Sequence, residues 1–212
     1  MEKNVYLYVS QGLADWEYSL AVSMISGFNK ELIKTRDYNV ITFGFTEEPV
    51  KTLAGITVIP DTNIDEIDLS DVAMIILPGS PSYEKEDPSW LVPLIRRCIE
   101  DNIPVAAICD ASLFLAKHGF LDDVRHTGCG PLWLKEHAPE YHGGEYYVDL
   151  PSVSDKGIIT ANPFGFVEFA YNIIAALDAF PPEFLEFWLI AVKEGYLNAD
   201  SFKKSGFKRG SH

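Results

Sequence analysis

Short apolar runs alternate along this chain with longer segments of helical periodicity, and this alternation is the strongest constraint on its fold. Runs rich in Val, Ile, Tyr and Phe favour strands, whereas apolar residues that recur every three or four positions favour an amphipathic helix. The strand-like runs lie at residues 5–10, 39–45, 72–79, 104–109 and 157–160, and the helical segments at residues 15–30, 89–102, 111–119 and 167–180. Strand–helix–strand repetition is typical of an α/β domain with a mainly parallel sheet.

Three details refine this prediction. The run VAMIILPG at residues 72–79 is almost entirely apolar, as expected of a strand buried on both faces of the sheet. Pro93 is expected to be a local fault in its helix, whereas Gly119 can close a helix in the left-handed conformation. Residues 55–61 and 145–150 are predicted to add hairpin or edge strands.

The domain organisation follows from length and from the position of the prolines. The chain has 212 residues, enough for one large domain with a well-buried core, and it contains no linker, repeat or low-complexity segment. Residues 1–180 are therefore predicted to form the α/β domain. Pro181 and Pro182 break the chain at that point, and residues 181–209 are predicted to be a helical extension packed on the same domain.

Charge and cysteine content narrow the partners and the compartment. The formal net charge of −14 argues against nucleic acid and an acidic membrane surface, because binding to phosphate needs a basic face. The three cysteines form no Cys-x-x-Cys pair, which argues against a structural zinc site and fits a reducing compartment. The first residues show no signal-peptide pattern, and no apolar run is long enough to span a bilayer. We therefore expect a cytoplasmic protein that acts on a small molecule or a peptide.

Three loops should meet at one edge of the predicted sheet, since ligands of open α/β sheets bind beyond the carboxyl ends of the strands. The first loop, GLADWE, carries Glu17, and the second, LPGSPSY, carries Gly79 and Ser80. The third, CDAS, begins at Cys109. Taken alone, Glu17 is also typical of an exposed glutamate that is stabilised in the first turn of a helix.

Cys109 stands between a predicted buried strand and a predicted helix, with no glycine or proline to make the turn. One interpretation is core packing, which is common for free cysteine. The other is a nucleophile, because a sharp strand-to-helix turn would lift the sulfur out of the sheet and the helix N-terminus would favour thiolate over thiol. The N–H groups of Asp110 and of Gly79 or Ser80 would then hold an oxyanion.

Four segments carry a resemblance to a known family: DWE in the first loop, LPG ending at Gly79, AAIC ending at Cys109, and TANPFGFVEFA towards the end of the chain. Together they resemble the ThiJ/PfpI family, which includes the parkinsonism-associated deglycase, PfpI-type intracellular proteases and class I glutamine amidotransferase-like proteins. The likeness spans residues 4–178. It is greatest to bacterial proteases or amidases, which share a segment like Arg125-His126-Thr127.

The resemblance implies a fold, an assembly and a site. The implied fold is a flavodoxin-like three-layer sandwich, the implied assembly is a homodimer, and the implied cysteine lies on a strained elbow. Family members place a glutamate from the first strand-to-helix loop against the cysteine, and Glu17 occupies that position here. Glu17 would then be protonated while the Cys109 sulfur is a thiolate, since two close anions are unfavourable.

The chain departs from the family beside the expected nucleophile. PfpI-type members have a histidine immediately after the cysteine, where this chain has Asp110, and a carboxylate is a poor general base at neutral pH. His126 is the first candidate base because it lies one strand beyond Cys109. His118 is the second, although its place at a helix end has a structural explanation. The histidine of deglycase-type members aligns near Cys129, a residue that could instead be a resolving thiol.

These observations support one leading hypothesis and two alternatives. The first is a cysteine-dependent, hydrolase-like or amidotransferase-like enzyme for a small aldehyde, a glycated adduct, an amide or a peptide, in which Glu17 and the candidate base His126 move protons for Cys109. The second is a redox or stress sensor in which Glu17 holds oxidised Cys109, and the third is a chaperone-like or structural dimer. No cofactor or metal is expected, because His137 and His142 are too loosely spaced and no phosphate-loop motif is present.

Overall fold

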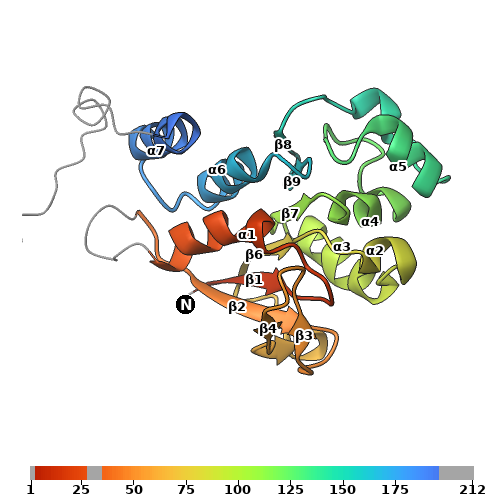
Figure 1. The fold of residues 1–212 in the computed structure, drawn as a ribbon, viewed down its shortest axis with the longest axis horizontal. Coiled ribbons are helices and arrows are strands. Elements are labelled where there is room, and N and C mark those ends of the chain that lie inside the picture. Colours follow the sequence, from red (N-terminus) through yellow and green to blue (C-terminus); the bar gives the residue numbers. More distant parts are fainter. Residues whose placement is uncertain (1–2, 28–34, 196–212) are drawn as a thin grey trace, which may run out of the picture.

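The computed structural model describes residues 3–27 and 35–195 and contains a seven-stranded sheet of order β5-β2-β1-β6-β7-β9-β8 (Figure 1). The strands of this sheet are β1 (Asn4–Tyr8), β2 (Asn39–Gly44), β5 (Thr62–Asn63), β6 (Val72–Leu77), β7 (Val105–Ile108), β8 (Ser152–Asp155) and β9 (Ile158–Ala161). Neighbouring strands are parallel except β8, which is antiparallel to β9. A separate antiparallel pair is formed by β3 (Val50–Lys51) and β4 (Thr57–Val58). The predicted α/β class with a mainly parallel sheet is confirmed.

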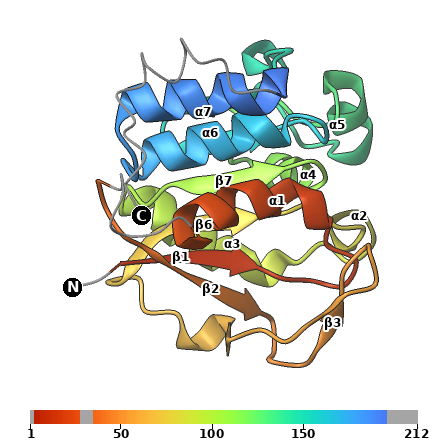
Figure 2. The ribbon, with the colours of Figure 1, turned by 60° about the vertical axis from the view of Figure 1, so that its left-hand side comes forward.

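Helices cover both faces of this sheet and complete a flavodoxin-like three-layer arrangement (Figures 1 and 2). The α-helices are α1 (Asp15–Val22), α2 (Ser82–Lys85), α3 (Val92–Glu100), α4 (Ala111–Lys117), α5 (Pro131–His137), α6 (Phe166–Ala176) and α7 (Pro182–Glu194). A π-helical turn, Ser23–Gly27, continues α1, and short 3₁₀ turns lie at Ile64–Glu66, Ser89–Leu91 and Gly143–Tyr146. Helices α1, α6 and α7 pack on one face of the sheet, and α2 to α5 contribute to the core on the other face.

Alternating side chains of the central strands supply these two cores. In β1, Val5 and Leu7 belong to the core beneath α1, α6 and α7, whereas Tyr6 and Tyr8 belong to the core on the opposite face. Successive residues of a strand point to opposite faces, so a strand covered on both sides must be apolar throughout. Strand β6 meets this requirement, since all its side chains except that of Ala73 are fully buried. The prediction of a doubly buried strand is therefore confirmed.

Two details of the sequence prediction are wrong for local reasons. Pro93 lies in the first turn of α3, where a backbone N–H has no helical partner to lose, so the expected fault is absent. Residues 145–150 form no strand: a 3₁₀ turn occupies Gly143–Tyr146, and beyond it Tyr147 makes only an isolated bridge with His126. By contrast, Gly119 follows α4 with a φ of 74°, the left-handed conformation predicted for a helix end.

Other predicted elements are present with different limits. Residues 55–61 include β4, which forms a hairpin with β3. The helix predicted at residues 15–30 corresponds to α1 and its π-helical turn, and residues 28–30 lie outside the described part of the chain. The helix predicted at residues 167–180 ends four residues early, at the C-terminus of α6.

Helix α7 packs against α6 through an apolar stripe. Phe184, Leu185 and Trp188 are buried and join the core that also contains Phe169 and Ile173 of α6. The two helices therefore share one core with the sheet. The rest of the predicted C-terminal extension, from residue 196 onward, lies outside the described residues.

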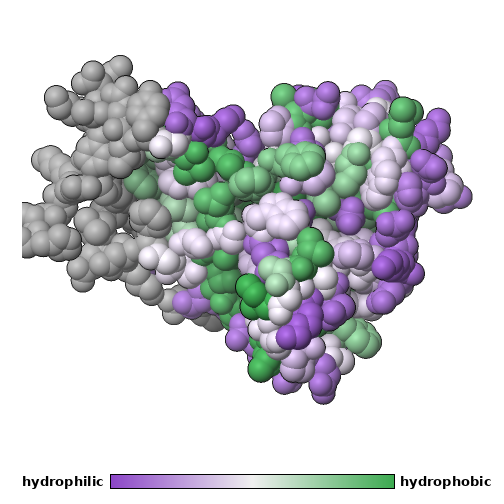
Figure 3. All heavy atoms as spheres, in the orientation of Figure 1, coloured by the Kyte–Doolittle hydropathy of each residue, from purple (hydrophilic) through white to green (hydrophobic). Residues whose placement is uncertain are grey.

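The surface of the described residues mixes polar and apolar groups. Figure 3 shows hydrophobic residues interspersed with hydrophilic ones over the face seen in Figure 1. The exposed apolar side chains include Trp16 and Phe164, and the latter is 86% exposed. None of the helices between residues 3 and 195 that the structure describes has the length and apolar character needed to cross a membrane.

Candidate active site

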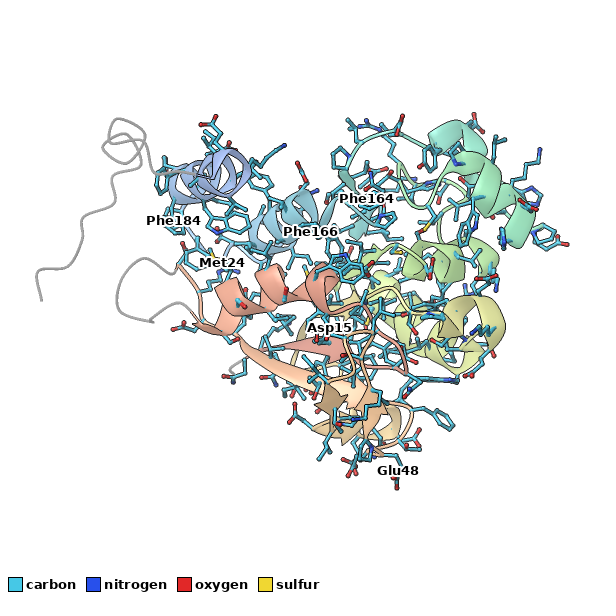
Figure 4. The ribbon with its side chains drawn as sticks, viewed as in Figure 1. Asp15, Met24, Glu48, Phe164, Phe166 and Phe184 are labelled. Carbon is cyan, nitrogen blue, oxygen red and sulfur yellow. The ribbon has the colours of Figure 1, made fainter. Side chains whose placement is uncertain are left out.

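The loops that follow β1, β6 and β7 lie at the same edge of the sheet. Figure 4 places Asp15 and Phe166, the first residues of α1 and α6, towards the same end of the molecule, with Met24 towards the other. Helix N-termini that follow parallel strands mark the carboxyl ends of those strands. The backbone N–H of Ala14 donates a hydrogen bond to the carbonyl oxygen of Gly79 at 3.0 Å, which ties the first loop to the second.

Cys109 occupies a strained turn between β7 and α4. Its φ of 58° lies in the left-handed region, which costs a residue with a side chain about 1–3 kcal/mol. The turn is held from both sides: the Cys109 N–H donates to the Ala161 carbonyl at 3.0 Å, and the N–H and hydroxyl of Ser112 donate to the Cys109 carbonyl at 2.9 and 2.7 Å. Cys109 as a whole is only half-buried.

Glu17 extends from the first turn of α1 into the protein and is 1% exposed. Its Oε2 accepts a hydrogen bond from the Gly79 N–H at 2.6 Å, whereas its buried Oε1 has no hydrogen-bond partner among the described residues. Burial raises the pKa of Glu17 to about 7, and the Gly79 bond and the neighbouring Cys109 thiol act in the opposite direction. The alternative of an exposed first-turn glutamate is therefore wrong.

Gly79 allows the carboxyl group and the sulfur to approach each other. A methyl group on its Cα would lie 2.7 Å from Glu17 Oε2, 2.8 Å from Cys109 Cβ and 3.2 Å from Cys109 Sγ. Side-chain carbons do not pack as closely as the first two of these distances. The φ of Gly79 lies outside the left-handed region, so backbone conformation does not require a glycine here. Close packing does.

The sequence suggested that the helix N-terminus stabilises a Cys109 thiolate. The surroundings of the sulfur in the structure do not support this suggestion. The contact with Cys129 and burial raise the pKa of the Cys109 thiol, and the carboxyl groups of Glu17 and Asp110 act in the same direction. Helix α4 is only seven residues long, so its dipole is small beside these effects. Burial and these neighbours thus favour the neutral thiol over the thiolate.

Cys129 and Asp110 complete a cluster around the Cys109 sulfur. Cys129 Sγ lies 4.0 Å from Cys109 Sγ, and Asp110 Oδ1 lies 3.7 Å from Cys109 Sγ and 3.6 Å from Cys129 Sγ. Burial raises the pKa of Asp110. The sequence pointed to Cys129 only through its position near the family histidine, and its contact with Cys109 depends on packing that the sequence does not reveal.

Both candidate histidines have other partners. His126 is fully buried, its Nδ1 lies 2.6 Å from the Val124 carbonyl oxygen, and its Nε2 lies 2.5 Å from the Tyr141 hydroxyl. The carbonyl can only accept, so Nδ1 carries the proton and Nε2 accepts from Tyr141. Burial lowers the pKa of His126, which keeps it neutral. His118 Nε2 pairs with Asp87 Oδ1 at 3.1 Å. Contrary to expectation, neither histidine hydrogen-bonds to the cysteine.

Two backbone N–H groups, in the loops that carry Gly79 and Cys109, have no hydrogen-bond partner among the described residues. Within the described part of the chain, the N–H groups of Asp110 and Ser80 donate to no protein atom. The Gly79 N–H, a third candidate from the sequence, donates to Glu17 and is not free. The hydroxyl of Ser80 donates to the Gln11 carbonyl at 2.8 Å, which fixes this loop against the one after β1.

Comparison with known proteins identifies the family of this chain. Residues 3–176 match the sequence profile of the DJ-1/PfpI family. The chain belongs to this family. A related sequence is the uncharacterized protease YoaZ of Bacillus subtilis, 31% identical over 88% of this chain and 89% of the relative. The glutathione-independent glyoxalase DJR-1.2 of Caenorhabditis elegans is 26% identical over 66% of this chain and 73% of its own length. A crystal structure of a ThiJ/PfpI protein from Bacillus anthracis superposes with a TM-score of 0.84 at 30% identity, covering 97% of this chain and 96% of that chain.

Proposed function

We propose that this DJ-1/PfpI protein is a cysteine-dependent enzyme for small 2-oxoaldehydes such as methylglyoxal. Cys109 is the nucleophile, Glu17 transfers protons, and the free N–H groups of Asp110 and Ser80 hold the oxyanion. The observation that carries the proposal is the convergence of a strained, half-buried cysteine and a buried glutamate on Gly79. A worm relative named as a glyoxalase supports the choice of substrate.

Cys109 has no histidine partner among the described residues, and this favours an aldehyde over a peptide as the substrate. Peptide hydrolysis needs an acid that protonates the leaving amine, a role that imidazole fills in cysteine proteases. His126 and His118 are bonded elsewhere. Addition to an aldehyde releases no amine, so one proton-transfer group suffices. The amide and peptide hypotheses therefore rank second, although related sequences are named as proteases.

The first step is addition of sulfur to the aldehyde carbon. The Cys109 S–H proton moves to a Glu17 carboxylate oxygen while the sulfur forms a bond to carbon, and the carbonyl electron pair moves onto oxygen. Before the proton transfer, the Cys109 thiol and the Glu17 carboxylate together carry one negative charge. After the addition, this charge lies on the substrate oxygen. Glu17, with a pKa of about 7, is matched to neutral pH as a general base. The N–H groups of Asp110 and Ser80 stabilise the resulting oxyanion.

The remaining steps isomerise the adduct and release it. Glu17 returns its proton to the oxyanion, which gives a hemithioacetal, and then takes the proton from the same carbon. Delivery of that proton to the neighbouring ketone carbon, together with transfer of the hydroxyl proton of the hemithioacetal to the former ketone oxygen, completes a 2-hydroxyacyl thioester. Water hydrolyses the thioester, releasing the 2-hydroxy acid and restoring the thiol. The sum is addition of one water to one 2-oxoaldehyde, and no external oxidant or reductant is needed.

The test measures methylglyoxal consumption and lactate formation by reduced protein in the presence of a chelator. We expect Cys109→Ser to lower kcat/KM at least about 10³-fold and Glu17→Gln at least about 10²-fold, in line with the loss of a nucleophile and of an acid–base group. Cys98→Ala is the matched control, because Cys98 is a fully buried cysteine of α3 that belongs to the core. Full turnover by Cys109→Ser would refute the proposal.

The same assay separates the other hypotheses. A redox sensor would gain oxygen on Cys109 under dilute peroxide without turnover of any aldehyde, and a chaperone-like protein would suppress aggregation whether or not Cys109 is present. The homodimer and the cytoplasmic location implied by the sequence stay predictions.

A further inference from the structure

We propose that Cys109, Asp110 and Cys129 form a binding site for a thiophilic divalent cation, of which Zn²⁺ is the representative. The three side chains offer two sulfurs and one carboxylate oxygen within 4.8 Å of one another. Nothing in the proposed aldehyde chemistry uses Cys129 or the carboxylate of Asp110. The site was missed in the sequence because its ligands come from two loops twenty residues apart, with no Cys-x-x-Cys spacing.

The geometry of the three atoms matches one face of a coordination tetrahedron. With Zn–S bonds of about 2.3 Å and Zn–O bonds of about 2.0 Å, tetrahedral angles place two sulfurs about 3.8 Å apart and a sulfur and an oxygen about 3.5 Å apart. The observed separations are 4.0 Å between the sulfurs and 3.7 and 3.6 Å between each sulfur and Asp110 Oδ1. A cation can therefore be bound with shifts of only a few tenths of an ångström.

The two loops that carry the ligands are held in place before any ion binds. Ser112 bonds twice to the Cys109 carbonyl, and a methyl group at Gly128 would lie 2.3 Å from the Ser112 hydroxyl oxygen. This close approach brings the loop of Cys129 against the elbow. The Tyr147 hydroxyl donates to the Gly128 carbonyl at 3.2 Å, and the Thr127 N–H donates to the Thr160 hydroxyl at 2.9 Å.

The donor set selects the class of cation and leaves one position open. Thiolates bind Zn²⁺ and similar soft cations and discriminate against Mg²⁺ and Ca²⁺, which prefer oxygen ligands. Cys109, Asp110 and Cys129 are all half-buried, so an ion can enter and a water or an anion can take the fourth position. Because Cys109 would then be a ligand, bound Zn²⁺ should protect it from alkylation.

The experiment titrates the reduced, metal-free full-length chain with Zn²⁺ against a chromophoric chelator, and with Co²⁺ by absorption spectroscopy. We expect one ion per chain, a thiolate-to-Co²⁺ charge-transfer band, and iodoacetamide labelling of Cys109 that slows at least tenfold when Zn²⁺ is bound. Cys129→Ser and Asp110→Asn should each weaken Zn²⁺ binding at least about tenfold, the lower range for loss of a metal-site interaction. Cys98→Ala should bind as the parent does.

Two results would overturn the site. One is the lack of saturable Zn²⁺ binding by the reduced parent chain, which would leave the three contacts as ordinary thiol hydrogen bonds. The other is unchanged affinity in Cys129→Ser or in Asp110→Asn when circular dichroism shows that the variant is folded. The readout is binding and not turnover, so failure of the aldehyde chemistry leaves this test intact. Conversely, loss of the metal site leaves the turnover assay, which contains a chelator, unaffected.

Discussion

Two regions of the molecule hold titratable groups but differ in how far their hydrogen bonds are made. One is the Cys109 cluster, taken here together with Glu17. The other is the His126 pocket, formed by Val124, Tyr141 and Tyr147. His126 has a partner for each ring nitrogen, is fully buried, and stacks edge-on to Tyr141 and Tyr147. The Cys109 cluster combines a half-buried cysteine at positive φ with a buried carboxylate oxygen of Glu17 that has no hydrogen-bond partner among the described residues.

This difference separates structural from chemical roles. A buried polar group with all its hydrogen bonds made contributes to stability and has no capacity left for a substrate. A strained residue beside an unsatisfied buried group reduces stability, and such features concentrate at functional sites. The sequence offered Cys109 as the nucleophile and His126 as its candidate base, and only the surroundings of the two side chains separate them.

The largest effect that tests the comparison is expected from Gly79→Ala. The new methyl group would meet Glu17 Oε2 and Cys109 Cβ at distances that require both side chains to move. Displacement of reacting groups by about 1 Å can cost 10²-fold in rate, so we expect methylglyoxal turnover to fall at least that far. Gly144→Ala is the matched control, because a methyl group there has no atom within 4 Å. Unimpaired turnover by Gly79→Ala would mean that the two side chains need not meet at this point.

The next effect in size concerns the His126 pocket. His126→Phe keeps a ring of similar volume but leaves the Tyr141 hydroxyl and the Val124 carbonyl without their partner. At about 1–3 kcal/mol for each unsatisfied buried group, the free energy of unfolding should fall by about 2–6 kcal/mol. Urea denaturation measures this loss. Turnover per folded molecule should be unchanged, and a fall of tenfold or more would restore His126 as a catalytic residue.

The sequence was informative where the fold depends on repeated local patterns. Doubly buried strands such as β6 and β7 are apolar runs, and the rule that ligands bind beyond parallel strands pointed to the loops of Glu17, Gly79 and Cys109. Strand β8 was missed because only Val153 of its four residues is buried, which leaves no apolar pattern. Helix α5 was missed because its seven residues bury only Leu134.

The parts of the site that the sequence did not reveal depend on contacts between distant residues. His126 looks like a candidate base until Tyr141, fifteen residues later, is known to bond its Nε2. Cys129 meets Cys109 only because Gly128 packs against Ser112. The pKa of the Cys109 thiol depends on burial and on three neighbours, which outweigh the effect of the helix that follows it.

The smallest predicted effect depends on pH and concerns Glu17. Its pKa is about 7 in the folded protein and close to 4.5 when unfolded. Between these values the folded state keeps a proton that the unfolded state releases, so the free energy of unfolding falls as pH rises from 4.5 to 7. Below pH 4.5 this loss in the free energy of unfolding is absent, and above pH 7 it is complete. At 1.36 kcal/mol per pKa unit, the shift of Glu17 corresponds to about 3 kcal/mol.

Glu17→Gln isolates this contribution, because glutamine accepts the Gly79 hydrogen bond but does not titrate. The stability of Glu17→Gln relative to the parent chain should therefore rise with pH across this window, by up to about 3 kcal/mol, and then level off. Urea denaturation from pH 4.5 to 8, with a chelator and a reductant, provides the measurement. Glu183→Gln, at an exposed glutamate in the first turn of α7, is the control and should show no such rise.

A flat difference for Glu17→Gln would mean that Glu17 is ionised in the folded protein even at pH 5. The Cys109 thiol would then lie beside a permanent anion, and Glu17 could not serve as the acid that returns a proton to the oxyanion.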